Sequence, residues 1–354
     1  MHFVEYMSTH GHEELAVWTD PAVGLKAFVA IHDRTLGPAL GGTRIWAHES
    51  EDAAIADVLA LSRAMTYKSA AAGLPYGGGK GLILADPRTA KTEALLRSYG
   101  RFVDTLQGRY ITTEDVGANA RDMEWISYET RHVVGLPESL GGSGNPSVVT
   151  GFGIFQAMRA CAEALWGSDD LKGRTVALQG FGNVATSLAG HLREAGATLV
   201  VTDTYAGALE RAKAMPGVQV VEPDAIFDAP CDIFAPCALG GTINERTIPH
   251  LKAAAVVGAA NNQLADEQAD AARLAERGIA YVPDYIANAG GVINVSYEIG
   301  RPYDRAGAMA KAAEIHQTAA RILADAARDG VTTVQAAARM AEERIASVRA
   351  ARRA

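Results

Sequence analysis

The stretch TVALQGFGNVATSLAGHLREAGATLVVTD, Thr175 to Asp203, determines the fold of the second half of this 354-residue chain. It starts with an apolar segment, Val176 to Leu178, and continues with Gly180, Gly182 and Ala185 in a Gly-x-Gly-x-x-Ala pattern. A segment of helical period and a second apolar segment complete the stretch. This order of strand, glycine turn, helix and strand predicts a βαβ unit with two parallel strands. An α/β fold is therefore expected for this half of the chain.

The glycine pattern is the fingerprint of a dinucleotide-binding site, and each position has a physical role. Gly180 allows the tight turn, Gly182 lets the backbone approach a pyrophosphate, and Ala185 lets the helix pack closely on the strand. The unpaired N–H groups at the start of the helix then face the anion. Asp203 follows 23 residues after Gly180, where its carboxylate can accept hydrogen bonds from ribose hydroxyls and repel a 2′-phosphate. The stretch predicts NAD rather than NADP; the alternative is a glycine turn that binds nothing, with Asp203 as a capping residue.

A second glycine-rich segment, GLPYGGGKG at 73–81, has one lysine, Lys80, after three consecutive glycines. A phosphate-binding P-loop requires Ser or Thr directly after its lysine, because that hydroxyl holds a magnesium ion. Here Gly81 follows Lys80, and Leu74 occupies the position of the motif's first glycine. A kinase or NTPase loop is thereby excluded. We expect instead that the glycines let backbone and substrate come close to Lys80.

Length and composition set the remaining bounds. A chain of 354 residues exceeds what one core usually supports, so two domains are expected. The net charge of −8 argues against a nucleic acid or an anionic membrane as partner. No apolar run approaches the ~20 residues of a membrane span, and the N-terminal residues lack the apolar region of a signal peptide. Three cysteines, Cys161, Cys231 and Cys237, are odd in number and lack metal-ligand spacing, which predicts free thiols, no metal site and a cytoplasmic location.

The pattern divides the chain near residue 140. Residues 1–140 mix strand-like and helical segments, such as a strand at 25–33 and a helix at 51–73. The segment 135–147 is rich in Gly, Ser and Pro and is expected to be an interdomain linker. Residues 1–140 are therefore expected to form a substrate-binding and catalytic domain, and residues 141–330 a dinucleotide-binding domain.

The second domain and the C-terminal region have their own expected elements. Further buried strands are predicted at 231–238, 254–262 and 280–290, and helices at 311–329 and 334–349. The terminal segment 331–354 is expected to be a helix that packs back on the first domain. Its last arginines, Arg349, Arg352 and Arg353, are expected to form a solvated tail.

Three polar residues of the first domain stand among apolar and glycine residues: Lys68 in AMTYKSAA, Lys80 in GGGKG and Asp115 in TTEDVG. Lysines in such surroundings are uncommon, because desolvating an ammonium is costly unless it is paired. Each residue alone has an ordinary structural explanation, on a helix surface, at a turn or in an Asx turn. Together, before a dinucleotide-binding domain, they indicate a carboxylate anchor, a catalytic amine and an acid/base carboxylate. An amine can act as a base near neutral pH where enclosure and a second cation lower its pKa.

A series of motifs extends this pattern over almost the whole chain and resembles the leucine/phenylalanine/valine dehydrogenase branch of the amino-acid dehydrogenases. The resemblance runs in order from about residue 12 to residue 345, through LGPALGGTR (36–44), MTYK (65–68), GGGKG (77–81), YITTEDVG (110–117), GNPS (144–147), GFGNVA (180–185), CDIFAPCALGGTIN (231–244), GAANNQL (258–264) and PDYIANAGGVIN (283–294). It implies an N-terminal α/β substrate and oligomerisation domain and a Rossmann-type dinucleotide-binding domain, with a cleft between them. It also implies an NAD-dependent, reversible oxidative deamination of an L-amino acid to a 2-oxo acid and ammonia, by a homo-oligomer.

The resemblance also implies a role for individual residues. Lys68 would hold the substrate carboxylate, Lys80 would act as base on the water that attacks the imino acid, and Asp115 would move protons to and from the amino group. The implied substrate contacts are Leu40, Gly41, Thr113, Asn262, Val292 and Val295. The implied cofactor contacts are Thr150 at the carboxamide, Gly180, Phe181, Gly182, Asn183, Val184, Asp203, Cys237, Ala238 and Asn262, with Asn288 at the floor of the cleft.

Two positions depart from the pattern of this branch. Gly81 stands where several relatives have a larger residue, and Thr113 stands where leucine enzymes commonly have alanine. The side chains expected around the substrate are of moderate size, which favours leucine or valine. Two alternatives remain open: a phenylalanine dehydrogenase of the same plan, and a non-catalytic NAD-binding regulatory protein.

Overall fold

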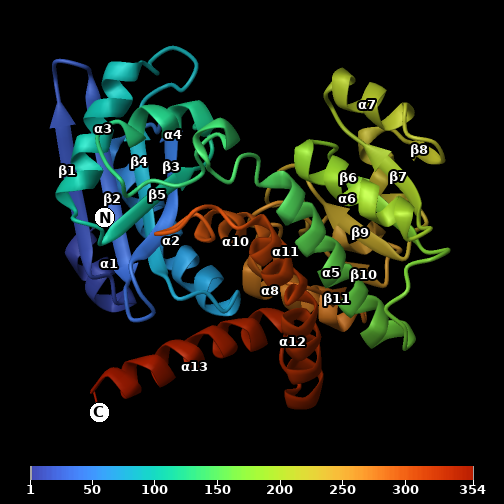
Figure 1. Cartoon of the computed structure of the whole chain (residues 1–354). Helices are drawn as coiled ribbons and strands as arrows, with labels where there is room; N and C mark the ends of the chain where they lie inside the picture. Colours follow the sequence, from blue (N-terminus) through green and yellow to red (C-terminus); the bar gives the residue numbers. More distant parts are fainter. Residues whose placement is uncertain (1, 354) are drawn as a thin grey trace. The chain divides into compact units, whose positions relative to one another are not determined.

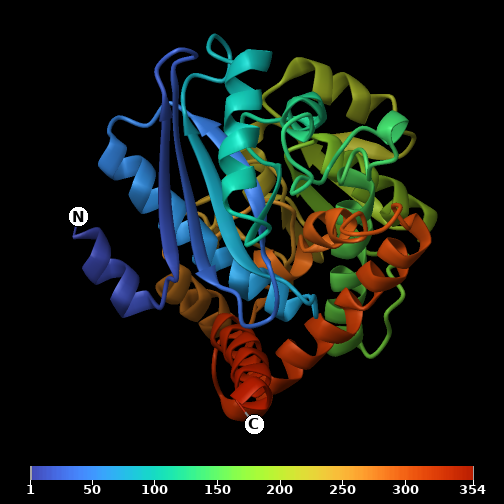
Figure 2. The same ribbon diagram turned by 60° about the vertical axis from the view of Figure 1, so that its left-hand side comes forward.

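The computed structural model describes residues 2–353, which form two compact units (Figures 1 and 2). Of the described residues, the first unit contains 2–145, 295–305 and 341–353, and the second contains Pro146–Asn294 and Ala306–Met340. Compared with the division expected from the sequence, 141–145 and 295–305 lie in the first unit, and 331–340 lie in the second. Both units are α/β, as the sequence predicts. Among the described residues, no helix combines the length and apolarity that a membrane span requires.

The first unit is built on a mixed five-stranded sheet in the order β1-β2-β4-β3-β5. Its strands are β1 (Glu14–Asp20), β2 (Leu25–Asp33), β3 (Ala39–Trp46), β4 (Gly77–Leu84) and β5 (Tyr110–Glu114). The β1–β2 and β2–β4 pairs are antiparallel, whereas β3 pairs in parallel with both β4 and β5. The carboxyl ends of β3, β4 and β5 therefore lie at one edge of the sheet.

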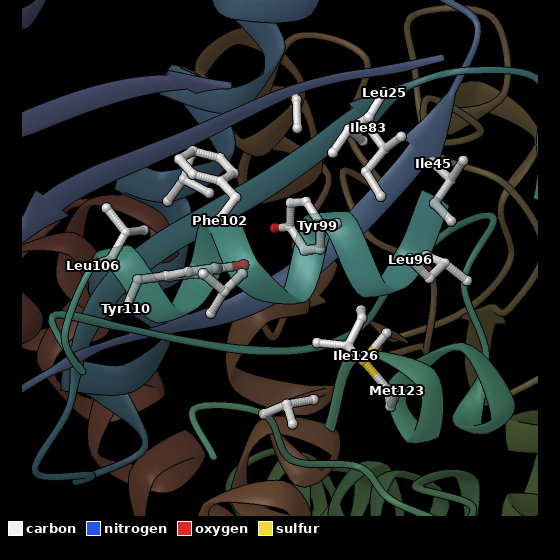
Figure 3. Close-up of a cluster of buried hydrophobic side chains, with 14 of the residues drawn as sticks. Leu25, Ile45, Ile83, Leu96, Tyr99, Phe102, Leu106, Tyr110, Met123 and Ile126 are labelled. Atoms are coloured by element: carbon white, nitrogen blue, oxygen red, sulfur yellow. The ribbon is translucent and has the colours of Figure 1, made fainter. Parts of the chain in front are cut away.

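Both faces of this sheet are covered by helices, because β2 and β4 have apolar residues on both sides. One face packs on α2 (Glu51–Ala71), with Phe28, Ala30 and Leu82 against Val58 and Leu59. The other face packs on α3 (Glu93–Thr105) and α4 (Ala120–Ser127), where Tyr99, Phe102 and Tyr110 are the large buried rings (Figure 3). The short helix α1 (Phe3–His10) precedes β1 in the chain. Ser50 starts α2 by accepting a hydrogen bond from the Ala53 N–H, which satisfies one of the free donors of the first turn.

Gly81 of β4 has a different function from the one expected of it. Gly81 faces the α3 side of the sheet, away from Lys80, where a Cβ atom would overlap the Tyr99 hydroxyl and lie 2.6 Å from Thr43 Oγ1. These hydroxyls form a buried network: Thr43 Oγ1 lies 2.7 Å from the Tyr99 hydroxyl and 2.6 Å from Thr112 Oγ1, and the Tyr110 hydroxyl donates to the Gly41 carbonyl. Gly81 thus makes room for the core behind the strand, and not for a substrate beside Lys80.

Gly81→Ala is expected to lower the free energy of unfolding by about 1–3 kcal/mol, because the new methyl group overpacks this buried hydroxyl network. Urea unfolding measures the effect. Gly190→Ala is the matched control: Gly190 lies in a helix of the second unit, and a Cβ atom there meets no heavy atom within 4 Å. That control should gain ~0.5–1 kcal/mol, since alanine is the better helix former. A Gly81→Ala protein as stable as the wild type contradicts this explanation of Gly81.

The second unit is a parallel six-stranded sheet in the order β11-β10-β9-β6-β7-β8. Its strands are β6 (Thr175–Gln179), β7 (Thr198–Thr202), β8 (Val218–Val220), β9 (Ile233–Pro236), β10 (Ala255–Val256) and β11 (Ala280–Tyr281). Renumbered within the unit, this is the order 6-5-4-1-2-3 of the doubly wound dinucleotide fold. The order reverses between β6 and β9, and ligands of such sheets bind outside the carboxyl ends of the strands at this point.

Helices connect these strands and extend to the C-terminus. They are α5 (Ser147–Trp166), α6 (Asn183–Glu194), α7 (Ala206–Lys213), α8 (Glu267–Glu276), α9 (Asp284–Ala287), α10 (Gly290–Ser296), α11 (Arg305–Ala313), α12 (Ile315–Asp329) and α13 (Thr333–Arg353). The predicted strand at 280–290 is wrong beyond its first two residues, because α9 starts at Asp284.

The last part of α13 belongs to the first unit. Arg344 donates from Nη1 to the Ala70 carbonyl (2.9 Å) and from Nη2 to the Leu74 carbonyl (3.0 Å), at the C-terminal end of α2. Arg349 pairs with Asp33 at the end of β2. Arg349 is exposed, as expected, but it lies in a helix and forms an ion pair, not in an unstructured tail.

Candidate functional site

The centre of the first unit's site is an ion pair between Lys80 and Asp115. Lys80 lies in β4 and is 5% exposed, and its Nζ lies 2.9 Å from Oδ2 of Asp115, the first residue after β5. The strand β3 runs between these two strands, so the Lys80 side chain must cross it. At the crossing β3 has Gly42, where a Cβ atom would lie 2.7 Å from the Asp115 Cβ. The absence of a side chain at Gly42 lets the pair form over the sheet.

Arg44 of β3 contacts the same carboxylate. Its Nε lies 3.2 Å from Oδ2 of Asp115, so two cations hold one carboxylate oxygen. Burial alone raises the pKa of the Asp115 carboxyl, but Lys80 and Arg44 outweigh burial, and its pKa lies below the ordinary value. Asp115 is therefore ionised at neutral pH in this arrangement.

Strand pairing places further predicted residues on the same face as Lys80. Leu40 pairs with Gly78 of β4, and Gly42 pairs with Thr113 of β5. Because alternate residues of a strand share a face, Leu40 and Thr113 lie on the face that carries Lys80. Lys68 lies half-buried in the last turn of α2, the helix that covers this face. The carbonyl of Gly41 accepts the Tyr110 hydroxyl, so Gly41 belongs to the buried hydroxyl network.

Thr113 is 9% exposed, and within the described chain its Oγ1 is buried without a hydrogen-bond partner. This hydroxyl packs against Gly135, where a Cβ atom would lie 2.6 Å from Oγ1 and 3.8 Å from a Val295 methyl group. Thr113 and Val295 therefore lie around Gly135. Val292 belongs to the second unit.

The glycine turn of the second unit has the form that a dinucleotide requires. Gly180 follows β6 with φ of +99°, a backbone conformation that residues with a side chain rarely adopt. A Cβ atom at this position would lie 2.7 Å from the Ala238 backbone nitrogen. Gly182 caps α6, and a Cβ atom there meets no heavy atom within 4 Å. Asn183 and Val184 form the first turn of α6, whose N–H groups point away from the helix. This open helix start, free of side chains at Gly182, fits a pyrophosphate.

Asp203 lies directly after β7 and organises the turn. Its Oδ2 accepts the Phe181 N–H (2.6 Å) and its Oδ1 accepts the Tyr205 N–H (2.8 Å). Asp203 therefore has a capping function as well as the predicted ribose function, for which its carboxylate keeps free lone pairs. Arg211 of α7 donates to the Phe181 carbonyl (3.2 Å) and places a cation at the same turn.

A second group of polar residues lies in the loops of this unit. Asn288 donates from Nδ2 to the Ala259 carbonyl (3.1 Å) and to Oδ1 of Asn261 (2.8 Å), while its own Oδ1 is buried with no partner among the described residues. Such an acceptor fits a ligand that offers an N–H group, as a carboxamide does. Asn262 is exposed with φ of +51°, and Thr150 donates to the Pro146 carbonyl in the first turn of α5.

Cys237 and Ala238 follow β9, next to the glycine turn, at the point where the strand order reverses. Desolvation raises the pKa of the Cys237 thiol to about 12. This thiol is therefore protonated at neutral pH and does not act as a nucleophile.

Sequence reasoning missed three residues of these sites: Gly42, Arg44 and Glu298. Gly42 and Arg44 lie in the segment 36–44. Nothing in the local sequence shows that these two residues interact with side chains of neighbouring strands. Glu298 accepts the N–H groups of Gly135 (3.0 Å), Leu136 (3.3 Å) and Ser143 (2.8 Å). It therefore fixes the segment that the sequence predicts to be a linker.

Comparisons with known proteins agree with this arrangement. The family model of the Glu/Leu/Phe/Val dehydrogenase dimerisation domain matches residues 13–132, and the Glutamate/Leucine/Phenylalanine/Valine dehydrogenase model matches residues 141–215 and 203–353. The chain is 50% identical to leucine dehydrogenase of Geobacillus stearothermophilus over 352 residues, which cover 99% of this chain and 95% of the relative. It is 46% identical to valine dehydrogenase of Streptomyces albus, with 99% and 97% covered.

A solved structure is also similar. The crystal structure of L-tryptophan dehydrogenase from Nostoc punctiforme superposes with a TM-score of 0.86 at 46% identity, covering 98% of this chain and 99% of that chain. The resemblance found in the sequence is confirmed.

Proposed function

The chain belongs to the Glu/Leu/Phe/Val dehydrogenase family of pyridine-nucleotide-dependent amino-acid dehydrogenases, and from this premise we propose that it deaminates a branched-chain aliphatic L-amino acid, leucine or valine, with NAD. The products are the 2-oxo acid, ammonia and NADH. The observation that carries the proposal is the ion pair of Lys80 and Asp115, whose carboxylate also contacts Arg44. A buried amine beside a carboxyl group whose pKa is lowered by two cations is typical of a functional site.

The described residues have the chemistry for each part of this reaction. Lys68 binds the substrate carboxylate, and Asp115 accepts a proton from the substrate amino group. A bound nicotinamide cofactor would supply the acceptor for the hydride of Cα. Lys80 accepts a proton from the water that attacks the imino carbon, and Asp115 returns its proton to the nitrogen of the resulting amino alcohol. As the C–N bond breaks, the hydroxyl proton passes to the departing ammonia, which leaves as ammonium, and Lys80 releases its proton to solvent. The net reaction consumes the amino acid, NAD⁺ and water, and it yields the oxo acid, ammonium, NADH and one proton.

The second unit supplies the residues that would hold the cofactor. Gly182 and the first turn of α6, including Asn183 and Val184, would hold the pyrophosphate, and Asp203 would accept the ribose hydroxyls. Phe181, Cys237 and Ala238 would contact the adenosine half. Thr150, Asn262 and Asn288 would hold the nicotinamide half, where the unpaired Oδ1 of Asn288 can accept an N–H group.

The side-chain pocket favours aliphatic substrates. We assign it Leu40, Thr113 and Val295 of the first unit, all buried and none cationic. Val292, which the resemblance also implies, is buried in the second unit. A glutamate side chain would bury its carboxylate unpaired, which is strongly unfavourable. Two relatives of about 50% identity are named for leucine and valine. An aromatic L-amino acid is the second candidate substrate, because the similar Nostoc punctiforme enzyme is named for L-tryptophan.

A stoichiometric assay tests the reaction class. Purified protein with NAD and L-leucine should form NADH, ammonia and the 2-oxo acid in a 1:1:1 ratio, and D-leucine should give none. Formation of NADH without ammonia, or no reaction with any L-amino acid, would refute the proposal. The homo-oligomer and the cytoplasmic location stay predictions of the sequence, the first supported by the match to a dimerisation domain.

A further inference from the structure

Arg44 links the Lys80–Asp115 pair to a second carboxylate. Its Nε binds Oδ2 of Asp115 (3.2 Å), and its Nη1 donates to Oδ2 of Asp57 (2.9 Å) in α2. The side chains of Arg44 and Asp57 are each 23% exposed, so both are partly buried. His48, shortly after β3, has Nε2 3.2 Å from the same Asp57 oxygen, without hydrogen-bond geometry. The chain of contacts runs Lys80–Asp115–Arg44–Asp57.

We infer that Arg44 is a positioning residue of the proposed reaction: anchored by Asp57, it holds the Asp115 carboxylate by Oδ2 and sets how firmly Lys80 keeps its proton. The inference rests on the proposed function. Arg44 touches neither substrate nor cofactor in this assignment and acts through Asp115.

The geometry explains why an arginine stands here. A guanidinium is planar and has donors along more than one edge, so it can bind two carboxylates at once in fixed directions. Arg44 uses Nε for one carboxylate and Nη1 for the other. Because both Lys80 and Arg44 contact Oδ2 of Asp115, Oδ1 is the oxygen that can exchange a proton with a substrate amine. Lysine at this position keeps the charge but has a single donor atom, and so cannot hold both carboxylates in the same way.

The charges in this series of contacts also determine how readily Lys80 loses its proton. In the wild type, the Asp115 carboxylate interacts with two cations, Lys80 and Arg44. Without Arg44 the carboxylate interacts with Lys80 alone, and the Lys80 ammonium then holds its proton more firmly. Loss of Asp57 has the opposite effect, because it removes an anion from the neighbourhood of the pair. The charged and titratable groups around the pair are Arg44, His48, Asp57, Lys68, Tyr110 and Glu114.

The test compares the pH profiles of L-leucine deamination in Arg44→Met, Arg44→Lys and Asp57→Asn. In Arg44→Met, we expect kcat to fall about 10-fold or more. The rise of activity with pH should move up by roughly one pH unit, because the Lys80 ammonium loses a neighbouring like charge and keeps its proton more firmly. Arg44→Lys should return the profile to the wild-type pH while kcat recovers only in part. Asp57→Asn should move the profile to lower pH by a smaller amount.

Arg97→Met is the control variant. Arg97 of α3 pairs with Glu129 through Nε at 2.7 Å, in the same unit but on a helix of the opposite face of the sheet. It should leave kcat and the pH profile unchanged. Thermal unfolding of each variant separates a folding defect from a shifted profile, since a defect in folding lowers the active fraction at every pH and does not shift the profile.

The outcomes are distinct. Opposite shifts in Arg44→Met and Asp57→Asn, with rescue by Arg44→Lys, support the inference. An active wild type with an unshifted profile in Arg44→Met overturns it and leaves the proposed function standing. If Arg44→Met does not fold, the Asp57→Asn profile decides, and no shift or a shift to higher pH overturns the inference. A wild type inactive on every L-amino acid overturns the proposed function and this inference together.

Discussion

Replacing Lys80 with methionine should lower kcat for deamination by at least ~10²-fold, the usual contribution of a general base. Methionine has a similar length and keeps the apolar stem packed in β4, but it cannot accept a proton from water. The wild-type rate should rise with pH, because a general base must be deprotonated to accept a proton, and this rise should be absent from the residual activity of the variant. Steady-state kinetics with L-leucine and NAD from pH 7 to pH 11 measure both effects.

Lys91→Met is the matched control for this variant. Lys91 pairs with Asp122 at 2.7 Å, and the Asp122 side chain is 3% exposed, so this is also a buried lysine–aspartate pair of the first unit. Its loss should lower stability, because an uncompensated buried charge remains, and should leave kcat of the folded protein within about twofold of the wild type. Near wild-type turnover in Lys80→Met would exclude Lys80 as the base.

The wild-type protein should prefer NAD to NADP by at least ~100-fold in kcat/KM. In the proposed assignment, the Asp203 carboxylate would accept the ribose hydroxyls at the position where NADP has its phosphate, and a close contact of like charges costs several kcal/mol. Asp203→Asn should narrow the preference, since it removes the charge while its amide oxygen can still accept one of the N–H groups of Phe181 and Tyr205. Arg211, already at this turn, then becomes a partner for the phosphate.

Asp232→Asn is the control for the cofactor experiment. Asp232 accepts the Thr175 N–H (2.8 Å) and pairs with Arg174 (3.1 Å) at the amino end of β6, the opposite end of the sheet from the glycine turn. Like Asp203, Asp232 accepts a backbone N–H group at the end of a strand. Asp232→Asn therefore measures the effect of losing such a carboxylate without changing the glycine turn. It should leave the ratio of NAD to NADP activity unchanged. Equal use of both cofactors by the wild type contradicts the assignment of Asp203.

The sequence predicts the second unit well because its information is local. The strand, the glycine turn, the helix and Asp203 lie within 29 consecutive residues, and βαβ units are right-handed and formed between neighbours in the chain. The predicted strand at 280–290 is wrong beyond Tyr281 because the apolar residues Ile286 and Ala287 are buried by a short helix as well as they would be by a strand. Short apolar runs do not distinguish these two structures.

The site of the first unit could be predicted only in part. Lys80 and Asp115 are visible because charged residues among glycines and apolar residues are unusual. Their direct pairing depends on β3, which lies between their strands and reaches this position through parallel pairing with both. Parallel pairing leaves no short turn in the sequence that marks it. The function of Gly42, Gly81 and Arg44 therefore emerges only from the folded sheet.

The central claim is that this chain deaminates a branched-chain aliphatic L-amino acid, and kcat/KM with NAD for L-leucine, L-valine, L-phenylalanine, L-tryptophan and L-glutamate tests it most directly. The buried, uncharged side chains assigned to the substrate pocket predict that leucine or valine gives the highest value. Leucine and valine should differ by no more than roughly 10- to 200-fold, because one methylene group is worth only ~1–3 kcal/mol. Glutamate should be the poorest substrate. A higher value for phenylalanine, tryptophan or glutamate than for both aliphatic substrates would contradict the account.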